Sequence, residues 1–319
     1  MEGKRANLAS RYVPLLGIAL LIGIIYAIGI DEILSSMENI DPFILASMPF
    51  LVSIAYMVQT FRLKLILASK GIDVGYWTLY RIQFIGAFYA VITPSRIGGL
   101  VRIGHISKAA RLPISSSSPA VIVDKFLDLL ALLILSFLGS VIIASDHGRI
   151  LAQTSFLIII IIFIAGYLHN KKRAIKAIEM LLRVLPQKSA LKDNIRNGLD
   201  DFYRFMPRKR DVIIPLALSL VSWLMLYSIA YLLISCMGER VDYIKFVLLY
   251  PIASVAGLLP VTISGLGTRE AALLAVFHGI ARPSSIIAVS LLSVVLCAIV
   301  PAFAGFLLSF RRHRSQVKI

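Results

Sequence analysis

Eight long apolar runs, separated by polar connections, constrain this chain more than any other feature. Each run has about the length needed to cross the hydrocarbon core of a bilayer as a helix, roughly 18–25 residues. The runs lie at residues 13–30, 43–60, 76–93, 119–145, 151–168, 211–237, 246–264 and 286–310. Of the 319 residues, 58% are apolar and 16% are charged, against about 45–50% and 25% in soluble domains. The sequence therefore predicts an all-α polytopic membrane helical bundle, formed by a single transmembrane domain over residues 1–319.

Several protein classes are excluded at this stage. The longest connection, 169–210, has 42 residues, which is too short for a separate catalytic domain of normal size. Both cysteines lie inside apolar runs, the histidines lack metal-ligand spacing, and no phosphate-binding loop occurs. We therefore expect a protein that is not an enzyme and that needs no cofactor and no metal.

The net charge of +16 is explained by membrane topology rather than by nucleic-acid binding. Basic residues gather in alternate connections, which places those connections inside the cell. The 169–210 connection holds twelve Lys and Arg against four acids, and 61–75 is also basic, whereas 31–42 holds four acids and no basic residue. Both termini are accordingly expected in the cytoplasm. Apolar residues at helical spacing within 169–210 predict amphipathic helices, lying either on the membrane surface or in a small cytosolic hairpin.

Two apolar runs, 76–93 and 246–264, begin and end on the same side of the membrane when every basic connection is placed inside. Such runs are expected to re-enter the membrane rather than cross it. Pro94 precedes Gly99 by five residues, and Pro260 precedes Gly265 by the same interval. An arginine follows each glycine, and a proline with serines shortly after it then precedes a full crossing.

The two blocks divide the chain into two halves, 1–145 and 146–319, with four apolar segments each. Counting the crossings makes the halves opposite in orientation, an inverted 4+4 repeat with two re-entrant elements on opposite sides. Inverted repeats with Gly/Pro-interrupted segments are typical of alternating-access transporters, whose substrate site lies between the halves. The alternative is that all eight segments simply cross.

The second block carries a family resemblance. Its sequence Ser264-Gly-Leu-Gly-Thr-Arg-Glu-Ala-Ala272 resembles the hallmark of the lysylphosphatidylglycerol synthase transmembrane-region family. The first block is similar to the family's first-half pattern at Pro94, Gly98, Arg102, Asp124, Lys125 and Asp128. The resemblance covers essentially the whole chain and implies a flippase-like integral membrane protein, because the membrane part of a bacterial member acts as a phospholipid flippase. We expect this protein to act without the soluble aminoacyl-transferring domain of the full synthase.

The chain departs from the family pattern at two places. Gly99-Leu100 stands where the family usually has an acidic residue, and Lys125 replaces a usual arginine. Lysine cannot make the planar, forked contact of a guanidinium group. We therefore expect no bidentate contact with a headgroup at that position.

Charged and glycine residues near the apolar segments form the candidate site. A charge near the bilayer centre costs roughly 2.5–3.5 kcal/mol, so each needs a partner, a cavity or a role. The expected substrate-binding residues are Arg96, Arg102, Asp124, Lys125, Asp128, Gly265, Gly267, Arg269 and Glu270. The two arginines of the first block would hold an anion at the inner side, or belong only to a basic loop.

Alternatives remain open for the individual residues. Asp128 forms either a local ion pair with Lys125 or part of a polar cavity, where it pairs with Arg269 or with a substrate cation. Glu270 either caps a helix or fixes Arg269, which binds a phosphodiester or faces outer water. Arg81 either lines the cavity or extends to the membrane surface.

Two functions from different classes remain. The chain either translocates an anionic or polyprenyl-linked lipid across the cell membrane, or serves as a non-transporting scaffold or lipid-binding partner for a separately encoded lipid- or glycosyl-transferase. Membrane lipids are the expected partners in both cases. A transferase and a second copy of the chain are further candidates, and no nucleic-acid partner is expected.

Overall fold

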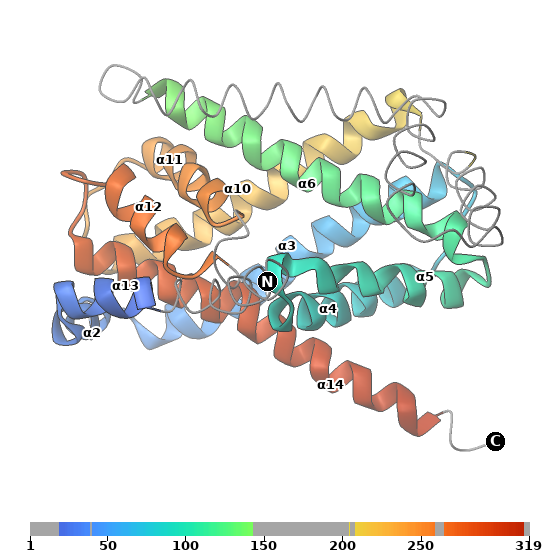
Figure 1. Cartoon of the computed structure of the whole chain (residues 1–319), viewed down its shortest axis with the longest axis horizontal. Helices are drawn as coiled ribbons and strands as arrows, with labels where there is room; N and C mark the ends of the chain where they lie inside the picture. Colours follow the sequence, from blue (N-terminus) through green and yellow to red (C-terminus); the bar gives the residue numbers. More distant parts are fainter. Residues whose placement is uncertain (1–18, 39, 143–203, 205–207, 259–264, 316–319) are drawn as a thin grey trace, which may run out of the picture.

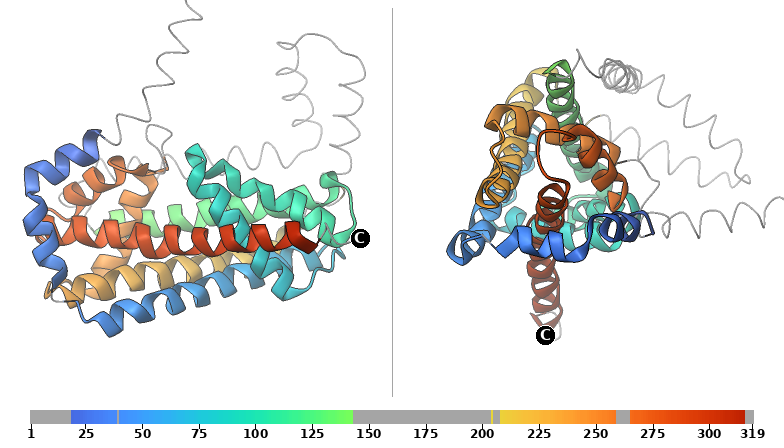
Figure 2. Two further views of the ribbon diagram at one scale, coloured as in Figure 1. Left: turned by 90° about the horizontal axis from the view of Figure 1, so that it is seen from below. Right: turned by 90° about the vertical axis from the view of Figure 1, so that its left-hand side faces the viewer.

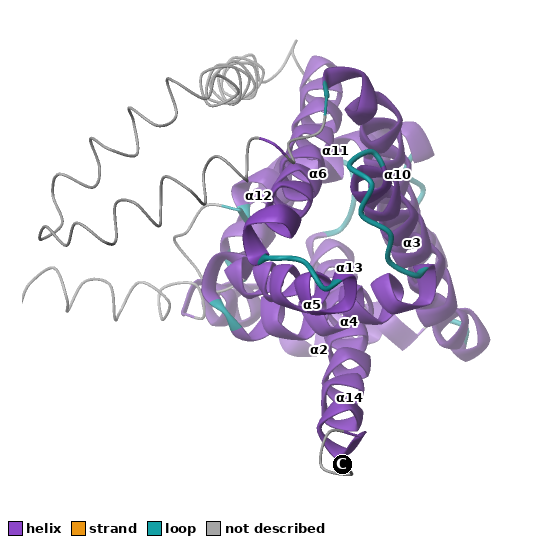
Figure 3. Cartoon of the chain, turned by 90° about the vertical axis from the view of Figure 1, so that its right-hand side faces the viewer, coloured by secondary structure: helices purple, strands orange, loops and turns teal. Residues whose placement is uncertain are grey.

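The computed structural model describes residues 19–38, 40–142, 204, 208–258 and 265–315. Within these ranges the chain forms helices joined by short turns, and no strand occurs (Figure 3). Among the described residues, three helices are long and apolar enough to cross a membrane, Pro42–Ala68, Arg210–Cys236 and Pro283–Ser309, and the bent pair Ala19–Ile28 and Ile30–Glu38 would make a fourth span if it crosses as one. The predicted all-α class is therefore confirmed. The predicted run at 151–168 and nearly all of the 169–210 connection lie outside the described residues.

The long helices of the described chain run along its longest axis (Figure 1). They are α3 (Pro42–Ala68), α6 (Ile114–Ile142), α10 (Ile213–Cys236), and the continuous α13 (Pro283–Val294), η4 (Val295–Ile299) and α14 (Val300–Ser315). The colour gradients in Figures 1 and 2 show that α6 and α10 run one way, and α3 and α13–α14 the other. These relative directions agree with the directions expected from counting the crossings.

The π-helical turn η4 has a local cause. Pro301 has no N–H group, and in a regular α-helix its ring would clash with the carbonyl four residues earlier. The wider π turn ends two residues before this proline, where it relieves that clash. It also places Cys297 and Ala298 on the wall of the central cavity described below.

Two short helical hairpins lie at opposite ends of the bundle (Figure 1). One consists of α4 (Tyr76–Ile92), the 3-10 helix η1 (Pro94–Val101) and α5 (Arg102–Ala110). The other consists of α11 (Tyr243–Ala256) and α12 (Thr268–Val276). In each hairpin the helices pack on one another. At 1.5 Å per residue, the 14 residues of α11 span only about 21 Å, less than the roughly 30 Å of a hydrocarbon core.

Two glycines allow helices from different halves of the sequence to cross in close contact. A side chain at Gly139 of α6 would collide with the backbone carbonyl of Leu248 in α11. One at Gly305 of α14 would collide with the backbone carbonyl of Phe84 in α4. The long helix that follows each hairpin thus packs on the first helix of the other hairpin.

The predicted end of the second run at residue 60 is wrong. Helix α3 continues to Ala68 and stops only before Gly71, which has φ +70°. Arg62, assigned from the sequence to a basic connection, is instead fully buried in this helix. Its charge does not end the helix because two carboxylates neutralise it, as described below.

The predicted acidic loop at 31–42 is also wrong, because most of it is helix α2 (Ile30–Glu38). The first helix, Ala19–Ile28, meets α2 at a bend of 73°, where Gly29 has φ +95°. Helix α2 packs on α13, and the buried hydroxyl of Ser36 bonds the hydroxyl of Ser284 at 3.1 Å.

Two other boundaries differ from the expected ones. Helix α6 begins at Ile114 rather than at 119, so the serine run forms its first turns. Helix α11 spans Tyr243–Ala256 instead of 246–264. Next to it, the α10–α11 turn is tied to the start of α13: Glu239 Oε1 accepts hydrogen bonds from Arg282 Nε at 2.5 Å and from the Ser285 hydroxyl at 2.8 Å.

Candidate functional site

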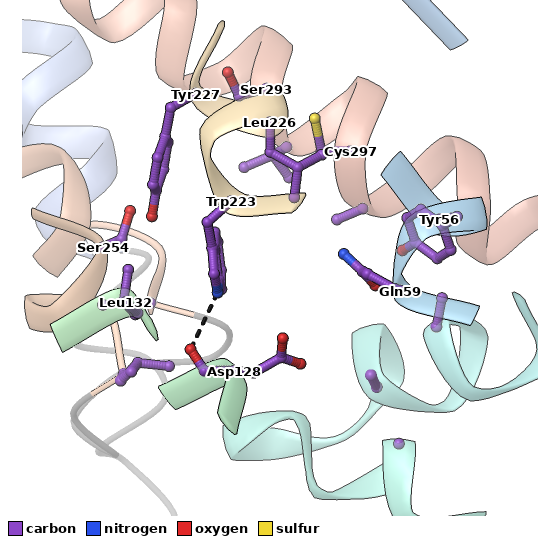
Figure 4. Close-up of a pocket in the computed structure, with 18 of the residues that line it drawn as sticks. Tyr56, Gln59, Asp128, Leu132, Trp223, Leu226, Tyr227, Ser254, Ser293 and Cys297 are labelled. Atoms are coloured by element: carbon purple, nitrogen blue, oxygen red, sulfur yellow. Dashed lines mark hydrogen bonds between the residues drawn. The ribbon is translucent and has the colours of Figure 1, made fainter. Parts of the chain in front are cut away.

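A cavity of about 250 Å³ lies where the two hairpins and the long helices converge (Figure 4). Eight helices of the described chain contribute charged or polar lining residues: Tyr56, Gln59, Gln83, Arg102, Lys125, Asp128, Trp223, Tyr227, Tyr250, Ser254, Arg269 and Ser293. Its volume equals that of about eight water molecules, enough for the polar headgroup of a lipid but not for its chains. Residues from both halves of the sequence therefore line one polar space.

Arg62 of α3 lies behind the first-half wall of the cavity, and its side chain is 0% exposed. Its Nε donates to Asp124 Oδ1 at 2.7 Å, and its terminal nitrogens contact Asp124 and Asp128. One of these nitrogens also donates to the hydroxyl of Ser219 in α10 at 2.7 Å. A buried ion costs several kcal/mol unless it is paired and hydrogen-bonded. Arg62 therefore joins α3, α6 and α10 behind the cavity.

Arg102, at the start of α5, reaches the same carboxylate from the hairpin. It donates to Asp124 Oδ2 at 3.2 Å and to the Gly99 carbonyl at 3.1 Å, and it also bonds the side-chain oxygen of Gln83. Its aliphatic stem lies against Gly86, where a side chain would collide with it. Asp124 is thus shared by two arginines and ties the hairpin to α6.

Lys125 and Asp128 form a local ion pair and also line the cavity, so the two positions that the sequence left open for Asp128 are compatible. Their charged atoms are 3.5 Å apart, one helical turn along α6, which is the predicted local pair. Both side chains also line the cavity, Lys125 at 49% exposed and Asp128 at 18%. Asp128 is further held by Arg62, and its backbone carbonyl accepts from the Trp223 indole at 3.1 Å (Figure 4). Arg269 faces the same cavity, but its contacts are with other residues.

Arg269, at the start of α12, lines the cavity from the second half and is held by the neighbouring Glu270. The guanidinium donates to Glu270 Oε1 at 2.8 Å and to the Ser290 hydroxyl of α13 at 2.7 Å. Glu270, which is fully buried, also accepts from the Gly267 N–H at 2.6 Å. Both proposed roles of Glu270, capping the helix and fixing the arginine, are therefore present in the geometry. Arg269 is 15% exposed and lines the cavity.

The turn before α12 depends on glycine. Gly265 and Gly267 have φ +78° and +85°, a region that other residues adopt at a cost. A side chain at Gly265 would also meet the Gly257 carbonyl at 2.5 Å. The two glycines therefore bring the start of α12 against the end of α11.

Comparison with known proteins identifies the family. Residues 14–305 match the model of the lysylphosphatidylglycerol synthase transmembrane region. The chain belongs to this family. It is similar to a UPF0104 membrane protein of Methanocaldococcus jannaschii, with 23% identity over 90% of each chain. It is also similar to a UPF0104 membrane protein of Pyrococcus horikoshii, with 24% identity over 95% of this chain and 97% of the relative. This protein is a multi-pass membrane protein of the family, as its apolar helices also indicate.

Two further arginines that the sequence singled out in this transmembrane-region protein, Arg96 and Arg81, do not contribute to the described cavity wall. The backbone of Arg96 lies in η1, and its side chain lies outside the described part. Arg81 is exposed and is not part of the cavity wall. The alternative in which Arg81 lines the cavity is therefore not supported.

Several residues that hydrogen-bond the charged side chains of this site, or their backbone, were not predicted from the sequence: Arg62, Gln83, Ser219, Trp223 and Ser290. Arg62 had a signal, because the residues after position 60 are good helix formers up to Lys70-Gly71. The serines carry no local signal, since each contacts a residue from another helix.

Proposed function

We propose that this protein translocates an anionic or polyprenyl-linked lipid across the cell membrane. The observation that carries the proposal is the polar cavity, which cationic side chains enter from both halves: Arg102 and Lys125 from the first, and Arg269 from the second. In a multi-pass membrane protein such side chains need a partner or a role. An anionic headgroup is the ligand that this lining fits best.

The arrangement of the helices supports an inverted repeat. In each half a short hairpin precedes a long helix, and the two hairpins lie at opposite ends of the bundle (Figures 1 and 2). The glycine crossings at Gly139 and Gly305 have the same pattern, each joining a long helix to the hairpin of the other half. We place the α4–α5 hairpin in the cytoplasmic leaflet and the α11–α12 hairpin in the outer leaflet, with both termini in the cytoplasm.

Such a cavity addresses the main barrier to lipid flip-flop. A charged headgroup that enters hydrocarbon loses its hydration, at an idealised cost on the order of 20 kcal/mol. Cations and hydroxyl groups fixed around the cavity replace that hydration, while the apolar chains stay in the surrounding lipid. Exposing the cavity alternately to either side would move the headgroup without passing it through hydrocarbon.

Each hairpin is attached to the following long helix by an arginine, and these links are suited to control access. Arg102 joins α5 to Asp124 of α6, and Arg269 joins α12 to Ser290 of α13. A phosphate that bonds either arginine competes with those contacts. The lipid itself would then loosen one hairpin while the other stays attached.

The test uses proteoliposomes with tail-labelled fluorescent phosphatidylglycerol and chemical quenching of the outer leaflet. Wild-type protein should move the lipid faster than empty liposomes, and Asp128→Asn and Arg269→Ala should slow it at least about tenfold, the effect of roughly 1.4 kcal/mol. Arg81→Gln, an exposed charge outside the cavity, is the matched control. Movement that neither cavity variant changes would refute the role of this site.

A folded protein that moves no lipid at all would instead favour the scaffold function. Topology is tested separately by single cysteines, after Cys236 and Cys297 are replaced by serine. A cysteine beside Arg102 should react only from the cytoplasmic side, and one beside Arg269 only from outside. Labelling of both from one side would contradict the inverted arrangement.

A further inference from the structure

We infer that the cavity selects a headgroup with one net negative charge, a phosphodiester, over zwitterionic headgroups and over dianionic phosphomonoesters. This inference rests on the proposed function and gives it a substrate class. It comes from the balance of charges that the described side chains bring to the cavity.

The charged side chains that line the cavity, or directly contact those that do, are Arg62, Arg102, Asp124, Lys125, Asp128, Arg269 and Glu270. Four of them are cationic and three are anionic, so the described site carries one positive charge in excess. Arg269 and Glu270 neutralise each other, and the excess therefore lies in the first-half wall.

Within that wall, Lys125 is the cation most available to a ligand. Its side chain is 49% exposed and its one described ion pair, with Asp128, is long at 3.5 Å. Arg62 and Arg102 are buried and bind two and one carboxylates, respectively. A phosphodiester that contacts Lys125 would neutralise the excess charge of the site before it competes for a contact of either arginine.

The same wall disfavours an ammonium group. Asp128 is the one carboxylate among the described lining residues, and it already bonds Arg62 and Lys125. The other polar lining groups near it, such as Gln59, Tyr56 and Ser254, are neutral. The rest of the headgroup therefore meets hydroxyl and amide groups, which suit a hydroxylated headgroup such as glycerol or a sugar.

The size of the expected selectivity follows from Coulomb's law. One unit charge at about 6 Å, in a medium with an effective dielectric constant of about 20, changes an equilibrium roughly a hundredfold. Water in the cavity reduces this effect. A preference of at least about tenfold for the monoanion is therefore the result to look for.

The experiment compares three tail-labelled lipids in the proteoliposome assay at pH 8: phosphatidylglycerol, phosphatidylcholine and phosphatidic acid. At this pH phosphatidic acid carries more negative charge than phosphatidylglycerol, because a phosphomonoester has a second ionisable proton and a phosphodiester does not. Wild-type protein should move phosphatidylglycerol at least about tenfold faster than the other two. Lys125→Gln should shift the preference toward phosphatidylcholine, and Gln59→Lys should shift it toward phosphatidic acid.

These two variants alter the charge without removing a partner from the buried arginines, and Arg81→Gln is again the control. Equal rates for the three lipids, or a preference that neither variant shifts, would overturn the charge selection while leaving translocation in place. Failure to move any of the three lipids would overturn this inference, and failure to move a labelled polyprenyl-linked lipid as well, by protein that elutes as a folded species, would overturn the proposed function.

Discussion

Replacing Arg62 with methionine should destabilise the protein by about 3 kcal/mol. The change removes the cation that Asp124 and Asp128 share and its bond to Ser219. Breaking a buried ion pair by removing one partner costs roughly 3–5 kcal/mol. We expect the lower end of that range, because Asp124 keeps Arg102 at 3.2 Å and Asp128 keeps a lysine at 3.5 Å.

The assay is reversible unfolding in mixed detergent micelles, followed by circular dichroism. Arg81→Met is the matched control, and as an exposed substitution it should stay within about 0.5 kcal/mol of wild type. Adding Asp124→Asn to Arg62→Met should recover part of the loss, with a coupling energy of about 0.5–3 kcal/mol. Arg62→Lys should rescue only partly, because an ammonium group cannot bond two carboxylates in a forked geometry. If Arg62→Met matches the Arg81 control, or the double variant shows no coupling, the buried network does not stabilise the bundle.

Three further contacts can be tested in the same way. Gly139→Ala should lower the free energy of unfolding by about 1–3 kcal/mol, because the added carbon would meet the backbone of Leu248. The control Gly104→Ala, where an added carbon meets nothing within 4 Å, should be neutral or slightly stabilising. Equal effects of the two substitutions would contradict a tight helix crossing. Burial alone would raise the pKa of Glu239, but hydrogen bonds from its arginine and serine partners and the arginine charge hold that pKa below its usual value. Its stabilising effect is therefore present at neutral pH and lost as the pH falls through the lowered pKa, so Glu239→Gln should lower Tm at pH 7 but not at the acid limit; a constant difference in Tm across pH would refute this. Trp223→Phe should cost about 1 kcal/mol through loss of the indole bond to α6, measured by unfolding, and an unchanged stability would show that the bond contributes nothing.

Periodicity and charge in the sequence predicted the helices that cross the bundle and the residues that gather at its centre. Lys125, Asp128, Arg102 and Arg269 do line one cavity. A charged residue within an apolar segment predicts its own surroundings, because its side chain is costly in hydrocarbon and needs a partner or a polar cavity. This is why residues from distant parts of the chain could be assigned to one site without an alignment.

Arg62 could not be assigned in that way. It lies two residues beyond an apolar run, where the rule for basic loops places an arginine outside the membrane. Its carboxylate partners lie 62 and 66 residues further along the chain, so no local pattern reveals them. Helix α2 was missed for a different reason: its acids suggested a loop, although Ile30, Ile33, Leu34 and Met37 have the spacing of an amphipathic helix.

Each hairpin has two kinds of attachment, and they differ in what a lipid could do to them. The glycine crossings to the other half bring backbone against backbone, and a headgroup has nothing to exchange for such contacts. The links to the hairpin's own half are arginine hydrogen bonds, from Arg102 to the Asp124 carboxylate and from Arg269 to the Ser290 hydroxyl, and Arg269 reaches the cavity at 15% exposed. A phosphate can replace a carboxylate or hydroxyl oxygen as the acceptor for a guanidinium group. Under the proposed function, each hairpin therefore separates from its own long helix and moves together with the long helix of the other half. Opening of the cavity at one end then also moves the long helix of the half whose hairpin closes the other end.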